Sequence, residues 1–217
     1  MPSTESRTER TKRRLFGLDR SGPPPSVTRR GAPLHPWTLP NFVGYVRLVA
    51  IPVFLVLAFE SDDGRALAPA LLYLGITLGD YLDGFLARAT GQYSRMGALL
   101  DPIVDRLAVL SGVLVAWHFE LLPRWALVIL AARELATLVL ARKALRHGID
   151  IEVNWIGRIG VFLVFGGIFW TMIFDWWILE AGFVLGVIFT LLATVVYVRA
   201  ARGRHPDEVT LHRHRPA

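Results

Sequence analysis

The sequence contains no cysteine. A disulfide framework and a thiolate metal site are therefore excluded, and cysteine usage leaves the redox compartment undetermined. Any metal ion bound by this chain must take oxygen or imidazole ligands. The amino end also lacks the apolar core and cleavage site of a secretory signal peptide, so we expect it to stay on the protein.

The positive charge of the chain is spread over several segments. The formal net charge is +6, but the Lys and Arg residues lie mainly at the two ends and in alternate loops. A nucleic-acid partner is not expected, because it would need basic side chains gathered on one face. Residues 1–36 are basic, rich in proline and without apolar periodicity, which predicts a disordered cytosolic arm that either stays solvated near anionic lipid or binds a partner. Residues 201–217 form a second basic tail.

Long apolar stretches occupy the rest of the chain. Hydrophobic residues make up 53% of the sequence, and the mean hydropathy is +0.42, which is high for a water-soluble domain. A bilayer core of about 30 Å needs about 20 apolar residues per helix. We expect an all-α polytopic membrane domain over residues 37–200 with six transmembrane helices. The predicted helices are 42–59, 66–86, 99–119, 125–145, 156–174 and 177–198.

The connecting segments alternate in charge. Acidic residues mark the first, third and fifth loops, at Glu60, Asp62, Asp63, Glu120 and Asp175. Basic residues mark the other loops and the carboxyl end, at Arg88, Arg95, Arg142, Lys143, Arg146, Arg199, Arg202 and Arg204. Because basic loops stay on the cytoplasmic side, this pattern predicts a multi-pass protein of the cell membrane with both termini in the cytosol.

Four aspartates interrupt the second and third apolar stretches. Asp80 and Asp83 are three residues apart near the end of one stretch, and Asp101 and Asp105 are four apart near the start of the next. Each pair therefore lies on one helix face, and a hairpin turn at about residues 88–96 allows the two faces to meet close to the cytosolic surface. Since an Asp at a helix centre costs about 2.5 to 3.5 kcal/mol on insertion scales, four such side chains need a cation or protonation.

Carboxylates without thiolate or imidazole suit hard cations such as Mg²⁺ or Mn²⁺. Two ions about 3.5 to 4 Å apart, bridged by shared carboxylates, form the usual clamp for displacement at phosphorus. Small residues beside the aspartates allow a ligand to approach the backbone, and Arg88 offers donors for a diphosphate. Taken singly, an intramembrane Asp has a helix–helix hydrogen bond as its alternative role, and a small residue more often serves packing. Pro102 either opens its helix or is tolerated as a kink.

The spacing of these residues resembles the signature of the class I CDP-alcohol phosphotransferases. It reads Asp80-x2-Asp83-Gly84-x2-Ala87-Arg88-x8-Gly97-x3-Asp101-x3-Asp105, and the similarity in layout covers residues 38–198. The resemblance implies a six-helix fold, a CDP-linked donor such as CDP-diacylglycerol, membrane lipids as surroundings, and two metal ions. It implies metal binding by the four aspartates, with Asp80 and Asp101 bridging both ions and Asp105 also acting as the base.

Further residues match family positions that contact the CDP-lipid. They are Gly84, Arg88, Ser94 and Gly97, together with Pro40 and Asn41 at the start of the first apolar stretch. For Pro40 and Asn41 an alternative stays open, because Pro-Asn before a helix is also an ordinary start signal.

The acceptor alcohol is less well defined by the sequence. Residues 39–47, 51–52 and 100–107 resemble the branch of phosphatidylglycerophosphate synthases and bacterial cardiolipin synthases, more than phosphatidylinositol-phosphate synthases. Arg133 and Arg158 are candidate contacts for an acceptor phosphate, and Arg133 has an ion pair with a neighbouring acid as its alternative. Near Arg158 the similarity to a Gly-Lys-x-Lys-Thr stretch fails, because Gly160 and Val161 replace the second Lys and the Thr. We expect glycerol 3-phosphate as the acceptor, with phosphatidylglycerol as the competitor.

A divalent-cation transporter is the alternative from a different class. It would need carboxylates near mid-membrane and a pathway to both faces, often with repeated halves. In this sequence the acids lie at one end of their stretches, and no internal repeat is visible. A non-catalytic lipid-binding scaffold is a weaker alternative still. The oligomeric state stays open, and a homodimer is compatible with the sequence.

Overall fold

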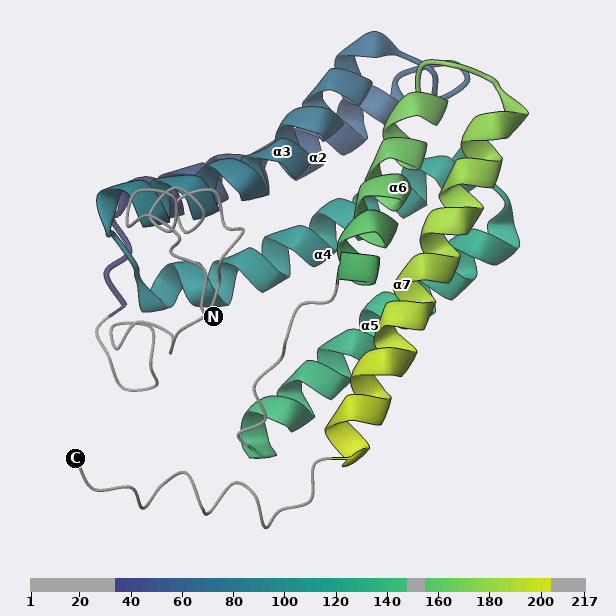
Figure 1. The fold of residues 1–217 in the computed structure, drawn as a ribbon. Helices are drawn as coiled ribbons and strands as arrows, with labels where there is room; N and C mark the ends of the chain where they lie inside the picture. The colour runs from purple at the N-terminus through teal and green to yellow at the C-terminus, as the bar shows by residue number, and fades with distance from the viewer. Residues whose placement is uncertain (1–33, 148–154, 204–217) are drawn as a thin grey trace, which may run out of the picture. The chain divides into compact units, whose positions relative to one another are not determined.

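The structure is a computed structural model that describes residues 34–147 and 155–203. The described residues form six α-helices and no strand, which confirms the predicted all-α class. The helices are α2 (Leu39–Phe59), α3 (Leu67–Thr90), α4 (Arg95–His118), α5 (Arg124–His147), α6 (Trp155–Thr171) and α7 (Trp177–Gly203) (Figure 1). Each predicted apolar stretch coincides with one helix. Most of the two predicted tails lies outside the described residues.

The described helices belong to two compact units, one ending at Phe119 and one beginning at Glu120. In the first unit, α2 packs along both α3 and α4, and α3 and α4 also contact each other. In the second unit, α6 and α7 form the most extensive helix pair, and α5 packs against α7. All four aspartates singled out by the sequence lie in the first unit.

Local signals determine where the helices of the first unit begin and end. Thr38 caps α2 by accepting a hydrogen bond from the Asn41 backbone N–H at 3.4 Å. Gly91, with φ +68°, ends α3 in the left-handed conformation that glycine adopts without strain. Ser94 then caps α4, so the turn between α3 and α4 covers only residues 91–94. The predicted turn at 88–96 was too long, because Arg88 still lies in the last turn of α3.

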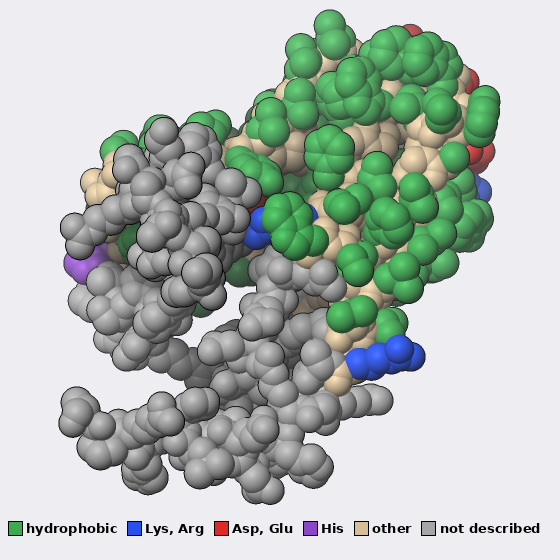
Figure 2. Space-filling view, in the orientation of Figure 1, with side chains coloured by type: hydrophobic (Ala, Val, Ile, Leu, Met, Phe, Trp, Pro, Cys, Tyr) green, Lys and Arg blue, Asp and Glu red, His purple; other side chains and the backbone are tan. Residues whose placement is uncertain are grey.

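The outward face of α2 is apolar rather than charged. Large hydrophobic side chains recur every three or four residues there and are exposed, namely Phe42, Val46, Val49, Val53 and Val56. On the face shown in Figure 2, hydrophobic side chains likewise cover most of the described surface. Large exposed apolar stripes are rare on water-soluble proteins, and they suit the hydrocarbon of a bilayer. The helix therefore has the surface of a membrane protein.

Three described helices are long and apolar enough to cross a membrane, by length and composition. They are α2, α3 and the part of α7 from Trp177 to Val196. The helix α6 is apolar but has only 17 residues. The helices α4 and α5 carry charged side chains within their apolar stretches, among them Asp101 in α4 and Arg133 in α5. By this criterion, three of the six predicted spans qualify.

The helices α6 and α7 approach each other through glycine. A Cβ atom on Gly160 would lie 2.8 Å from both the backbone nitrogen and the Cγ2 atom of Thr190. A Cβ atom on Gly186 would lie 2.9 Å from the Val164 backbone nitrogen. Such small residues let helix backbones pack closely, and within a membrane this packing replaces the hydrophobic driving force.

We expect Gly160→Ala to destabilise the protein by about 1 to 3 kcal/mol, because the added methyl group has no room against the backbone of α7. Thermal unfolding of the detergent-solubilised protein measures the effect. Gly166→Ala is the matched control, since it lies in the same helix and a Cβ atom there meets nothing within 4 Å. Equal melting temperatures for the two variants would contradict the close contact.

Candidate functional site

The four aspartates lie on two neighbouring helices of the first unit. Asp80 and Asp83 come from α3, and Asp101 and Asp105 from α4. The Asp83 side chain is only 5% exposed, whereas those of Asp80 and Asp105 are 49% and 37% exposed. Asp101 is half-buried and interacts electrostatically with the other three carboxylates. The cluster therefore has a buried side at Asp83 and a side that is open to the surroundings.

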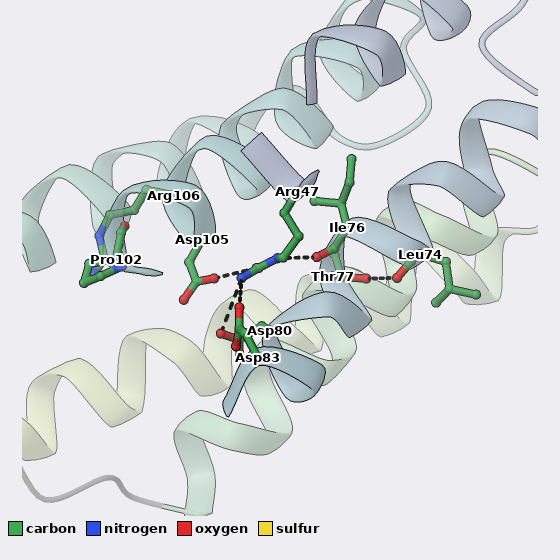
Figure 3. Close-up of polar contacts among 9 residues, drawn as sticks. All are labelled: Arg47, Leu74, Ile76, Thr77, Asp80, Asp83, Pro102, Asp105 and Arg106. Atoms are coloured by element: carbon green, nitrogen blue, oxygen red, sulfur yellow. Dashed lines mark hydrogen bonds and ion pairs between the residues drawn. The ribbon is translucent and has the colours of Figure 1, made fainter. Parts of the chain in front are cut away.

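Arg47 of α2 lies where the side chains of Asp80, Asp83 and Asp105 meet (Figure 3). Its Nη1 donates to Oδ2 of Asp83 at 2.9 Å, and its Nη2 donates to Oδ1 of Asp105 at 2.7 Å. Nη1 also lies 3.8 Å from Oδ1 of Asp80. The Nε atom donates to the Ile76 carbonyl at 2.8 Å. One guanidinium therefore joins α2, α3 and α4 and partly offsets the charge of the carboxylates.

The course of the Arg47 side chain depends on Gly79 in α3. A Cβ atom on Gly79 would lie 2.6 Å from Cδ and 2.8 Å from Cγ of Arg47. Any larger residue at this position would push the arginine stem away from α3. The small residue thus gives the guanidinium access to Asp83, one turn further along the same helix.

Arg47 was not among the site residues predicted from the sequence, although its signal was present. It is the single charged residue of α2, whose other residues are mostly apolar. A cation at this depth of an apolar helix must find an acidic partner or a water-filled cavity. The sequence does not say which of the four aspartates that partner is.

The donor set of the cluster fits a hard divalent ion. It offers carboxylate oxygens and includes neither thiolate nor imidazole, as Mg²⁺ and Mn²⁺ prefer. Within the described residues, however, no group of three or more acidic or histidine side chains is arranged to surround one ion. The carboxylates of Asp83 and Asp105 are directed at Arg47, so ion binding requires them to present a further oxygen or to turn. Metal binding by the four aspartates stays a prediction.

The predicted donor-binding residues at the starts of α2 and α4 lie together. The Asn41 side chain, 2% exposed, donates to the carbonyls of His35 and Pro36, both at 3.0 Å, and accepts from the Ser94 hydroxyl at 2.8 Å. Ser94 in turn accepts from the Gly97 backbone N–H at 2.9 Å. The Asn41 side chain therefore connects the segment before α2 to the start of α4. An ordinary helix start signal would not make this contact with a second helix.

Three other predicted donor-binding residues are placed as follows. Pro40 is buried in the first turn of α2. Gly84 and Arg88 are one turn apart on α3, and the guanidinium of Arg88 folds back over Gly84, with Nη1 3.1 Å from where a Cβ atom of Gly84 would lie.

Pro102 is tolerated inside α4, because the helix continues through it.

The two predicted acceptor contacts, Arg133 and Arg158, belong to the second unit. Arg133 forms an ion pair with the adjacent Glu134, and its Nε donates to the Thr194 hydroxyl at 3.3 Å. The ion pair with a neighbouring acid, which was the alternative to acceptor binding for Arg133, is therefore present. Arg158 lies over the ring of Trp155, with its guanidinium carbon 5.0 Å from the ring centroid, a distance typical of a cation–π contact.

Comparison with known proteins agrees with the resemblance seen in the signature. The family model described as CDP-alcohol phosphatidyltransferase matches residues 37–196. A cardiolipin synthase (CMP-forming) of Streptomyces coelicolor is 40% identical over 129 residues, which are 58% of this chain and 60% of that protein. A CDP-diacylglycerol--glycerol-3-phosphate 3-phosphatidyltransferase of Salmonella typhimurium is 29% identical over 187 residues, covering 79% of this chain and 99% of that protein. The Bacillus subtilis protein of the same description is 28% identical, over 57% of this chain and 70% of its own length. Since the family model matches well over half of its residues, the chain belongs to the CDP-alcohol phosphatidyltransferase family.

Proposed function

We propose that this protein transfers the phosphatidyl group of CDP-diacylglycerol to glycerol 3-phosphate and releases CMP. The observation that carries the proposal is the convergence of Asp80, Asp83 and Asp105, from two helices, on one guanidinium. Family membership supplies the donor class. The descriptions of the Salmonella and Bacillus relatives, which name CDP-diacylglycerol and glycerol 3-phosphate, support the substrates.

The proposed setting is the cell membrane, crossed by all six described helices, with the aspartates near the cytosolic surface. Three helices support this by length and composition alone. The charged residues that weaken the signal of α4 and α5 include the functional acids of α4 and the Arg133–Glu134 pair of α5. Buried and paired charges are tolerated in membrane helices when they face the protein interior. The alternation of acidic and basic loops supports a cytosolic position for both termini.

The proposed site holds two Mg²⁺ or Mn²⁺ ions between α3 and α4. The resemblance to the family implies that Asp80 and Asp101 would contribute to both ions, Asp83 to the first and Asp105 to the second. Bound there, the ions would polarise the phosphate oxygens and offset the negative charge that develops during displacement. The open side of the cluster, at Asp80 and Asp105, is the side from which a nucleotide would enter.

In this proposal the protein's own side chains bind the donor and move one proton. Arg88 holds the diphosphate, and Gly84 and Gly97 let it approach the helix backbones. Asp105 takes the proton of the acceptor hydroxyl as that oxygen forms its bond to the phosphatidyl phosphorus. The bond from phosphorus to the CMP oxygen breaks, and CMP leaves with the electron pair.

Phosphatidylglycerol is the second candidate acceptor, which would make the product cardiolipin. The Streptomyces relative is described as a CMP-forming cardiolipin synthase and shares the higher identity over its matched length. The structure adds a reason at Gly160, which packs against the backbone of α7 and cannot be replaced there by a long cationic side chain without moving α7. A pocket with fewer cations binds a small dianion less tightly.

The test offers several acceptors to the detergent-purified protein with CDP-diacylglycerol and Mg²⁺. Glycerol 3-phosphate, phosphatidylglycerol and inositol phosphate are supplied in parallel, while CMP release and the lipid product are measured. Phosphatidylglycerophosphate as the main product supports the first candidate, and cardiolipin supports the second. Ion transport without CMP release would refute both and favour the transporter alternative.

Replacement of Arg158 tests the acceptor pocket. We expect Arg158→Ala to raise the KM for glycerol 3-phosphate about tenfold, because one charge-assisted hydrogen bond to the phosphate is lost, while kcat changes little. Steady-state CMP release at varied acceptor concentration measures both constants. Arg124→Ala is the control, since Arg124 begins α5 and its guanidinium forms an exposed ion pair with Glu120. An unchanged KM in the Arg158 variant would place the acceptor pocket elsewhere.

A further inference from the structure

We propose that Arg47 is a positioning residue that fixes the carboxylates of Asp83 and Asp105 relative to each other, so that they are ready to bind divalent ions. The inference rests on the metal site of the proposed function. It assigns to α2 a part in a site whose predicted ligands all come from α3 and α4. Its basis is the hydrogen-bond geometry around the guanidinium (Figure 3).

Buried hydrogen-bond partners hold the Arg47 guanidinium in place. The Arg47 side chain is 4% exposed, its Nε is bonded to the Ile76 carbonyl, and its Nη1 is bonded to the almost fully buried Asp83. Moving it away would leave the Asp83 carboxylate and the guanidinium without these partners in a water-poor region, which is costly for both charges. Arg47 therefore remains in place when an ion binds, and it keeps the orientation of the carboxylates to which it is hydrogen-bonded.

Arg47 contacts only one oxygen of the Asp83 carboxylate and one oxygen of the Asp105 carboxylate. The hydrogen bonds go to Oδ2 of Asp83 and Oδ1 of Asp105, so the second oxygen of each group is the one that would bind an ion. Carboxylates that bind metal ions are commonly held by an outer hydrogen-bond donor in this way, and the donor sets their orientation. Because the planar guanidinium presents its donors in a rigid fork, it holds the two carboxylates at a defined spacing.

Lysine cannot reproduce this arrangement. Its ammonium group keeps the charge but lacks the fork that reaches two carboxylates and the Ile76 carbonyl together. We therefore expect Arg47→Lys to weaken the binding of Mn²⁺ about tenfold, the lower end of the effect seen when an outer partner of a metal ligand is lost. Isothermal titration of the detergent-purified protein with Mn²⁺ alone, without substrate, measures this constant.

Arg106→Lys is the matched control for that titration. Arg106 lies next to Asp105 in the sequence, but its Nη1 donates at 3.3 Å to the carbonyl of Pro102 rather than to a carboxylate. The substitution removes the same guanidinium fork at the edge of the cluster. Its Mn²⁺ affinity should stay close to that of the wild-type protein.

A second pair of variants leaves Arg47 itself unchanged. Gly79→Ala places a methyl group 2.6 Å from Cδ of Arg47 and so displaces the arginine stem, while Gly75→Ala, one turn earlier on α3, meets nothing within 4 Å. Both substitutions favour the helical state by about 1 kcal/mol, so a loss of Mn²⁺ affinity does not arise from a weaker helix. We expect the loss in Gly79→Ala and not in Gly75→Ala. Raising the Mn²⁺ concentration should restore CMP release by the Gly79 variant.

The outcomes separate this inference from the proposed function. Weaker Mn²⁺ binding in Arg47→Lys and Gly79→Ala, with unchanged elution on size exclusion, supports the positioning role. Binding equal to that of their controls overturns it, and tighter binding also overturns it, because the guanidinium would then compete with the ion. If the wild-type protein binds no Mn²⁺, the metal site itself fails, and the inference fails with it.

Discussion

Replacing Asp105 with asparagine is expected to reduce CMP release by a factor of about 10² to 10⁴, the usual contribution of a general base. Asparagine has the same shape, and its carbonyl oxygen can still accept the hydrogen bond that Nη2 of Arg47 donates to Asp105. It cannot take a proton from the acceptor hydroxyl. Binding of CDP-diacylglycerol should therefore remain measurable while turnover is lost. Single-turnover CMP release together with equilibrium binding of the donor distinguishes the two effects.

Asp62→Asn is the control for this experiment. Asp62 is an exposed carboxylate in the segment between α2 and α3, away from the aspartate cluster. Its replacement removes the same charge and should leave turnover near the wild-type rate. Comparable activity of the Asp105 and Asp62 variants would remove Asp105 from the role of base and leave it as a ligand at most.

Replacing Arg47 with methionine is expected to lower the free energy of unfolding by about 3 to 5 kcal/mol, the range for removing one partner of a buried ion pair. Methionine retains much of the volume of the arginine stem and removes every donor of the guanidinium. The Asp83 carboxylate, 5% exposed, then loses its charged partner in the interior of the first unit. Unfolding by a denaturing detergent, followed by circular dichroism, measures the loss.

Two comparisons show whether the loss comes from the buried charge. Arg124→Met breaks an exposed pair with Glu120, four residues away along the chain, and should cost only about 0.3 to 0.5 kcal/mol. The double variant Arg47→Met, Asp83→Asn removes both buried charges and should recover part of the stability lost in the single variant. If Arg47→Met were as stable as Arg124→Met, the ion pair would contribute nothing to folding.

The helices were predictable because an apolar run of about 20 residues is typical of a membrane-spanning helix. Each of the six predicted stretches coincides with an observed helix, and the ends differ by at most a few residues. Caps explain two of those differences, as Thr38 and Ser94 start α2 and α4 earlier than their apolar residues do. The predicted number of six membrane spans is only partly supported. Length and composition support three, since α4 and α5 carry charges that count against a span and α6 has only 17 residues.

The pairing of the aspartates on helix faces follows from their spacing alone. Residues three or four apart share a face, so Asp80 pairs with Asp83 and Asp101 pairs with Asp105. The structure brings Asp80, Asp83 and Asp105 to a common partner, and that partner is on a third helix. Their roles as ligands and base stay predictions. For Arg133, the structure shows the ion pair with Glu134 that is the alternative to acceptor binding.

The sequence by itself determined the family, the helices and the faces that carry the acids, because these depend on local spacing and on apolar length. Only the tertiary structure decided that Arg47 lies among the carboxylates, that Gly79 makes room for it, and that Asn41 ties α2 to Ser94. These contacts join residues 29 to 58 positions apart. Nothing in a local pattern encodes such partners, since they depend on how α2 packs along α3 and α4.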